Sequence, residues 1–68
     1  MKMAVLKVLE VLSSSTKSWE EAAQNAVADA AKSLRGIKSV NVKNFSAVVK
    51  DGKISEYRLN SKITFEVE

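Results

Sequence analysis

A segment near the start of the chain, Met3 to Leu12, has the alternation of a β-strand but is apolar on both of its faces. The alternating positions divide into two apolar sets: Met3, Val5, Leu9 and Val11 on one face, and Ala4, Leu6, Val8 and Leu12 on the other. A strand of this kind needs cover on both sides. One helix covers only one side, so the pattern predicts that another subunit covers the second.

The absence of cysteine and histidine strengthens this expectation of self-association in a chain of 68 residues. Domains below roughly 70–80 residues rarely obtain more than a few kcal/mol from one core, and disulfides, metals or oligomerisation compensate. Disulfides are excluded here, and the commonest zinc ligands are missing. The usual general base and the thiol nucleophile are missing too, so we expect a protein that is not an enzyme.

The middle of the chain predicts a helix after a short polar connection, Ser13 to Lys17. The run Ser18-Trp19-Glu20-Glu21 fits a capping box, in which the Ser hydroxyl accepts from an amide and Glu21 reaches back. Lys32 and Arg35 suit the negative end of the helix dipole, and Gly36 is placed to end the helix. A mostly small apolar stripe follows helical spacing: Ala23, Ala26, Val27, Ala30, Ala31 and Leu34.

The C-terminal half predicts a β-hairpin, with strands from Val40 to Lys50 and from Ile54 to Val67 around Asp51-Gly52. A uniform register pairs Val49 with Ile54, Ser46 with Tyr57 and Val40 with Ile63, and it places Phe45 opposite Arg58. The apolar face of the hairpin should receive the helix. The prediction is one α+β domain over residues 1–68, with β-α-β-β order and a three-stranded antiparallel sheet folded around one helix.

Several runs in this order resemble the dodecin family across essentially the whole chain. They are Lys7 to Val11, Ser13 to Thr16, Ser18 to Val27, Ser33-Leu34-Arg35, Asp51 to Ile54, Glu56-Tyr57 and Lys62 to Val67. The resemblance implies a β-α-β-β protomer that assembles as a hollow homododecamer. It also implies a role in binding, storing or buffering small ligands: flavins (FMN, FAD or riboflavin), and in some members coenzyme A or metal ions.

The resemblance carries two flavin-contacting positions onto this chain. A Trp early in the second strand, which stacks on the flavin ring in the family, corresponds to Ser39, with Lys38 before it. A Gln that hydrogen-bonds the ring corresponds to Arg58, which follows Tyr57. Both departures shift the expected ligand from a stacked flavin pair toward weakly held flavin or a phosphate-bearing molecule such as coenzyme A. The expected ligand-binding residues are Ser39, Arg58, Phe45 and Lys38.

Each of these residues also has a plainer interpretation. Arg58 could clamp a phosphate or carboxylate, but a surface ion pair, for example with Glu56, is the more common role of a strand charge. Trp19 is expected to pack on the sheet or a neighbouring subunit, and Phe45 to contact a neighbouring subunit or a ligand. Converging carboxylates or amides at a symmetry axis would be needed for a hard cation, with Asn44, Glu56 and Glu66 as candidates.

Charge and hydropathy bound the remaining classes of function. The net charge of +3 permits electrostatic attraction to nucleic acid, but the sequence carries no recognisable nucleic-acid motif. A basic nucleic-acid-binding module and a structural shell without a flavin site are therefore alternatives to ligand storage. No apolar run approaches the roughly 20 residues of a membrane span, and the N-terminus has no signal-peptide pattern. We expect a cytoplasmic homo-oligomer that binds a small molecule.

Overall fold

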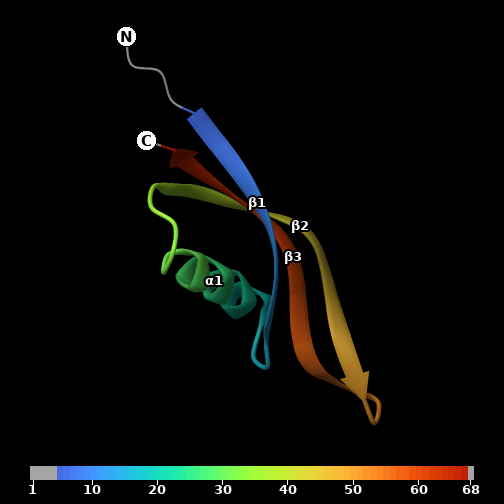
Figure 1. Ribbon diagram of the computed structural model, residues 1–68. Coiled ribbons are helices and arrows are strands. Elements are labelled where there is room, and N and C mark those ends of the chain that lie inside the picture. The colour runs from blue at the N-terminus through green and yellow to red at the C-terminus, as the bar shows by residue number, and fades with distance from the viewer. Residues whose placement is uncertain (1–4, 68) are drawn as a thin grey trace.

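The computed structural model describes residues 5–67, which form three strands and one helix in β-α-β-β order. The elements are β1 (Val5–Ser15), α1 (Trp19–Ala30), β2 (Ile37–Lys50) and β3 (Lys53–Val67). The strands make one antiparallel sheet in the order β1-β3-β2, and α1 lies against one face of it (Figure 1). The predicted fold class is confirmed.

β1 continues through the three serines that were predicted to form a connection. Ser13 and Ser15 pair with Leu59 and Tyr57 of β3, so the strand ends at Ser15 rather than at Leu12. The reason is that the hydroxyls bind α1: Ser13 Oγ donates to the Ala22 carbonyl at 2.8 Å. Met3 and Ala4, the predicted start of the strand, lie outside the described residues.

The helix begins at the predicted N-cap residue, but the second hydrogen bond of the predicted capping box is made by a different residue. The Glu21 amide donates to Ser18 Oγ at 3.0 Å, which confirms Ser18 as the N-cap. The Glu21 carboxylate accepts instead from Ser15 Oγ at 2.7 Å, and Ser15 Oγ accepts from the Ser18 amide at 3.3 Å. Ser15 thus takes the place predicted for Glu21, because its buried hydroxyl lies between the strand end and the helix.

The helix ends earlier than the apolar stripe predicted. Its last residue is Ala30, after which the Ser33 amide donates to the Ala30 carbonyl at 3.1 Å in a tighter turn. Lys32 and Arg35 therefore lie beyond the end of the helix. Gly36 does not cap α1, because the C-cap residue is Ala31. Gly36 has a φ of +73°, and its carbonyl accepts from the Glu66 amide at 2.9 Å. It therefore connects the end of the loop after α1 to β3.

The hairpin has the predicted turn but an irregular register. Asp51 and Gly52 both have positive φ (52° and 75°), as a two-residue turn of this kind requires, and Lys50 pairs with Lys53. The pairs Val49–Ile54 and Val40–Ile63 are confirmed.

From Val48 to Asn44, between those two confirmed pairs, the predicted register is wrong by one residue. Ala47 pairs with Tyr57, Ser46 with Arg58 and Phe45 with Leu59. Register shifts between Val48 and Val49 and between Val42 and Asn44 cause this. A one-residue slip moves a side chain to the opposite face. Phe45 therefore lies on the helix side of the sheet, not opposite Arg58.

The core of the protomer is small because the helix contributes alanines. Buried positions between α1 and the sheet are Ala22, Ala26, Ala30, Leu59 and Ile63. Ten large apolar residues of the described part remain exposed, and β1 has them on both faces, with Leu6 and Leu9 56% and 45% exposed. The Cα radius of gyration is 14.2 Å, whereas a compact domain of this length has about 11 Å. No helix within residues 5–67 is long and apolar enough to cross a membrane.

Candidate functional site

The sheet face that α1 does not cover, called here the outer face, carries a band of polar side chains across all three strands. Arg58 of β3 has Ser14 of β1 on one side and Ser46 of β2 on the other. Directly opposed residues in antiparallel strands share a face. Because Leu59 and Ile63 are buried under α1, the alternating Arg58 points to the outer face.

This band forms an open hollow of about 420 Å³, called here the outer trough. Its lining is mostly serine, amide and charged side chains: Leu12, Ser13, Ser14, Asn44, Ser46, Glu56, Arg58, Leu59 and Asn60. Three residues singled out from the sequence, Arg58, Glu56 and Asn44, meet here. The serines and Asn60 were missed, because only the cross-strand register shows that they adjoin Arg58.

Arg58 makes an ion pair within its own strand. Its Nε lies 3.0 Å from Glu56 Oε1, and the two side chains are 57% and 35% exposed. An exposed pair of this kind contributes only about 0–1 kcal/mol to stability. Guanidinium carries five N–H donors, and within residues 5–67 only Nε is bonded to another side chain. The terminal nitrogens can therefore face a ligand or a neighbouring protomer.

A second charged group crosses the outer face beside the trough. Lys43 of β2 reaches Glu10 of β1 over the central strand, with Nζ 3.4 Å from Oε2. The side chains of Asn60 and Lys43, with a smaller effect of Lys62, hold the pKa of Glu10 below its ordinary value. The alternation of β2 alone did not indicate this pair, since Lys43 stands at an irregularity in the register.

The four expected ligand-binding residues do not converge within one protomer. Ser39 pairs with Thr64, six residues from Arg58 along β3, which corresponds to about 20 Å. Lys38 is at a register shift near Ser39, and its Nζ lies 3.4 Å from Glu66 Oε1. Phe45 is on the helix side. A site that combined these residues would need neighbouring copies.

The candidate metal ligands divide in the same way. Asn44 and Glu56 line the outer trough, whereas Glu66 is paired with Lys38 at the other end of the sheet. Within residues 5–67, no three carboxylate, histidine or cysteine side chains cluster in a way that could hold a metal ion.

The helix side of the sheet has an apolar cleft at the start of α1. The Trp19 ring stands edge-on to Tyr57 and Phe45, with centroids at 4.8 and 5.8 Å, and its Nε1 donates to the Ser46 carbonyl at 3.1 Å. The prediction that Trp19 packs on the sheet is confirmed. A hollow of about 350 Å³ here, called the aromatic cleft, is lined by Trp19, Glu20, Ala23, Val42, Phe45 and Leu59.

Comparisons with known proteins agree with this architecture. The family model described as Dodecin matches residues 5–68. A dodecin variant from Thermus thermophilus is 29% identical, with 97% of this chain and 98% of that chain covered and a TM-score of 0.93. A dodecin from Streptomyces coelicolor is 26% identical, with 100% and 97% covered and a TM-score of 0.94.

A third similar structure is a calcium dodecin from Mycobacterium tuberculosis, described as a calcium-chelating immunodominant antigen with a novel calcium-binding site. It is 34% identical, with 94% of this chain and 91% of that chain covered and a TM-score of 0.81. No curated protein matches the chain in sequence.

Proposed function

Because the chain belongs to the dodecin family, whose model matches residues 5–68, we propose that it is a homododecameric, non-enzymatic protein that binds and stores a small ligand in the cytoplasm. The observation that carries the assembly is the incomplete protomer. Ten large apolar side chains of the described part are exposed, on both faces of β1 and along the hairpin. A second subunit would bury this surface, and burial yields about 25 cal/mol per Å² of apolar area.

The chemistry of the outer face favours an anionic ligand. Arg58 offers terminal guanidinium nitrogens in a trough lined by serine hydroxyls and amides, a donor set that suits phosphate or carboxylate. Ser39 supplies no aromatic ring, and stacking on a ring is worth about 0.5–1.5 kcal/mol beyond area burial. We therefore favour a phosphate-bearing molecule such as coenzyme A over tightly stacked flavin, with Ser39 and Lys38 contributed by neighbouring copies.

A divalent cation is the second candidate, supported by the similarity to the calcium dodecin and by Asn44 and Glu56 in one trough. Glu66 would have to come from another copy. Against it, the Arg58 guanidinium lies 3.0 Å from the Glu56 carboxylate and offsets its negative charge. The electrostatics of this trough therefore favour an anion over Ca²⁺.

The proposal is tested first by native mass spectrometry of protein as purified from cells. Twelve chains of 7.4 kDa give about 89 kDa, and bound ligand adds to that mass. Titrations with coenzyme A, FMN and Ca²⁺ then rank the ligand classes. A monomer or dimer would contradict the assembly. A bare dodecamer that binds none of the three would instead favour a structural shell.

The role of Arg58 is tested by Arg58→Ala. We expect the dodecamer to persist and affinity for the phosphate-bearing ligand to fall about tenfold or more, since a charge-assisted hydrogen bond is worth roughly 1.5–3 kcal/mol. Arg35→Ala is the matched control, because it removes the same charge from an exposed loop outside the trough. If Arg58→Ala gives small oligomers, Arg58 stabilises an interface instead.

A further inference from the structure

We propose that the aromatic cleft receives the tip of the β2–β3 hairpin from a second copy of this chain. The hairpin tip is defined as residues 49–54, which are Val49, Lys50, the turn Asp51-Gly52, Lys53 and Ile54. This inference rests on the assembly proposed above, and it names which two surfaces of the protomer meet there.

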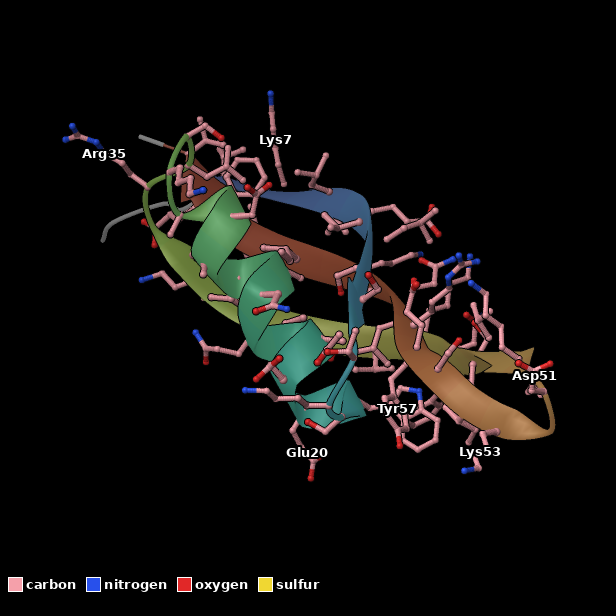
Figure 2. The ribbon with its side chains drawn as sticks, turned by 90° about the horizontal axis from the view of Figure 1, so that it is seen from below. Lys7, Glu20, Arg35, Asp51, Lys53 and Tyr57 are labelled. Atoms are coloured by element: carbon pink, nitrogen blue, oxygen red, sulfur yellow. The ribbon has the colours of Figure 1, made fainter. Side chains whose placement is uncertain are left out.

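The first argument is shape. The hairpin extends beyond α1 as a projecting arm (Figure 1). The cleft is a hollow at the beginning of α1. Glu20 lies at that beginning of the helix, and Asp51 and Lys53 lie at the far end of the hairpin (Figure 2). Five residues separate Phe45 from Lys50, about 16 Å of paired strand. A protomer cannot fold its own tip back into its own cleft without breaking that pairing.

The second argument is the apolar surface on each side. Val49 and Ile54 face each other across the hairpin and are 62% and 49% exposed. In the cleft, Phe45 and Val42 are 65% and 41% exposed beside the Trp19 ring. Neither surface is covered by α1 of the same chain. A pair of aliphatic side chains at the end of an arm fits an aromatic-lined hollow of about 350 Å³.

The third argument is charge. Lys50 and Lys53 are directly opposite each other in the register, and like charges in this position destabilise a hairpin. Asp51 offsets only part of their charge. Among residues 5–67, Glu20 is the one charged residue that lines the cleft, and it is exposed. The Glu20 carboxylate of the copy that receives the tip would therefore pair with Lys50 and Lys53 of the inserted tip.

The contact joins two different surfaces, so each copy gives one tip and receives one. Contacts of this head-to-tail kind close into a ring when they repeat about a symmetry axis. The proposal therefore places the hairpin tip and the aromatic cleft at a rotational axis of the assembly, separate from the outer trough on the opposite face of the sheet.

Isotope-resolved cross-linking tests the contact directly. Unlabelled and ¹⁵N-labelled chains are co-refolded and treated with a carbodiimide, which joins a carboxylate to an amine in contact with it. We expect peptides that link Glu20 of one isotope to Lys50 or Lys53 of the other. An oligomer without this cross-link overturns the contact and leaves the assembly standing. A monomer in the same experiment means that the assembly itself fails.

Charge exchange gives an independent readout. We expect Glu20→Lys and Lys53→Glu each to raise the protein concentration of half-assembly about tenfold, and the double variant to recover most of it. Asp29→Lys is the control, because it makes the same charge change on an exposed helix position outside the cleft. Equal effects of Asp29→Lys and Glu20→Lys, or no recovery in the double variant, would overturn the proposal.

Trp19 reports on the same cleft, since it is the only tryptophan of the chain. Insertion of Val49 and Ile54 removes water from its ring, so its emission should shift to shorter wavelength on assembly. Ile54→Ser should reverse the shift, whereas Ala28→Ser, a change at an exposed helix position outside the cleft, should not. An emission maximum that does not respond to Ile54→Ser while the oligomer is intact would contradict insertion.

Discussion

Gly36 and Gly52 have nearly the same positive φ, but only Gly36 is confined by its surroundings. A Cβ at Gly36 would lie 3.0 Å from the Glu66 carbonyl oxygen, whereas a Cβ at Gly52 would meet nothing within 4 Å. The Gly36 carbonyl also accepts from the Glu66 amide. Gly36 therefore permits the loop after α1 to approach β3 closely, and Gly52 serves the turn alone.

Alanine substitution should separate these two roles. We expect Gly52→Ala to lower the free energy of unfolding by about 1 kcal/mol, the cost of a left-handed backbone at a residue with a side chain. Gly36→Ala adds a steric conflict with backbone, so about 2–3 kcal/mol is expected. Urea unfolding at one protein concentration measures both. Equal losses would show that the Glu66 contact does not constrain Gly36.

Glu10 should make the fold sensitive to acid. Its neighbours Asn60 and Lys43 lower its pKa in the folded state, so the ionised form stabilises the fold above the unfolded pKa of roughly 4.3. That contribution is lost as the pH falls through the folded-state pKa. Between about pH 5 and pH 3, wild type should therefore lose more stability than Glu10→Gln. Parallel pH profiles of the two proteins would contradict the role of Glu10.

At the scale of the element, α1 packs on the sheet through alanines spaced four residues apart. Ala22, Ala26 and Ala30 are buried, and Ile63 of β3, which is fully buried, packs against the last two. Small side chains let the helix axis approach the strands closely, but they fill little volume. Ile63 and Leu59 are therefore the only large apolar side chains that are buried among the described residues.

Truncation of Ile63 should consequently be costly. Ile63→Ala is expected to lower the free energy of unfolding by about 2–5 kcal/mol, and the conservative Ile63→Val by about 0.5–1.5 kcal/mol. Chemical unfolding monitored by circular dichroism measures the difference between them. If both variants lose the same free energy of unfolding, the residues around Ile63 have moved to fill the space. The close approach of α1 then does not depend on the Ile63 side chain.

At the scale of the whole molecule, the protomer is elongated and buries little apolar surface. Its Cα extents are 56 × 20 × 13 Å, and only five apolar residues of the described part are buried. Edge strand β1 is exposed along both faces. Neighbouring subunits of the assembly proposed above would cover the apolar surface that this protomer leaves exposed.

Stability should therefore depend on protein concentration. If assembly supplies the missing burial, the midpoint of thermal unfolding rises as the protein is concentrated, because association stabilises only the folded chain. Scanning calorimetry over a wide range of concentrations tests this, with mass measured alongside. A constant midpoint for a species of monomer mass would contradict the expectation that other subunits complete the core.

Several features could be predicted from the sequence alone: the order of the elements, the helix N-cap at Ser18, the Asp51-Gly52 turn and the two-sided apolar pattern of β1. These features depend on residues that are near each other in the chain, so a period of two, a cap or a turn dipeptide is enough to indicate them. The family resemblance, and with it Arg58 as a candidate, also came from the order of local motifs.

Only the tertiary structure decided the register between the two ends of the hairpin. The shifts at Val48/Val49 and Val42/Asn44 move Phe45 to the helix side and bring Ser46 beside Arg58, while the pairing of β1 with β3 places Ser14 on its other side. They leave no mark in the alternation of either strand alone, because a bulge is defined by how two strands pair. The Ser15 bond to Glu21 and the early end of α1 likewise depend on contacts between elements, which no local pattern contains.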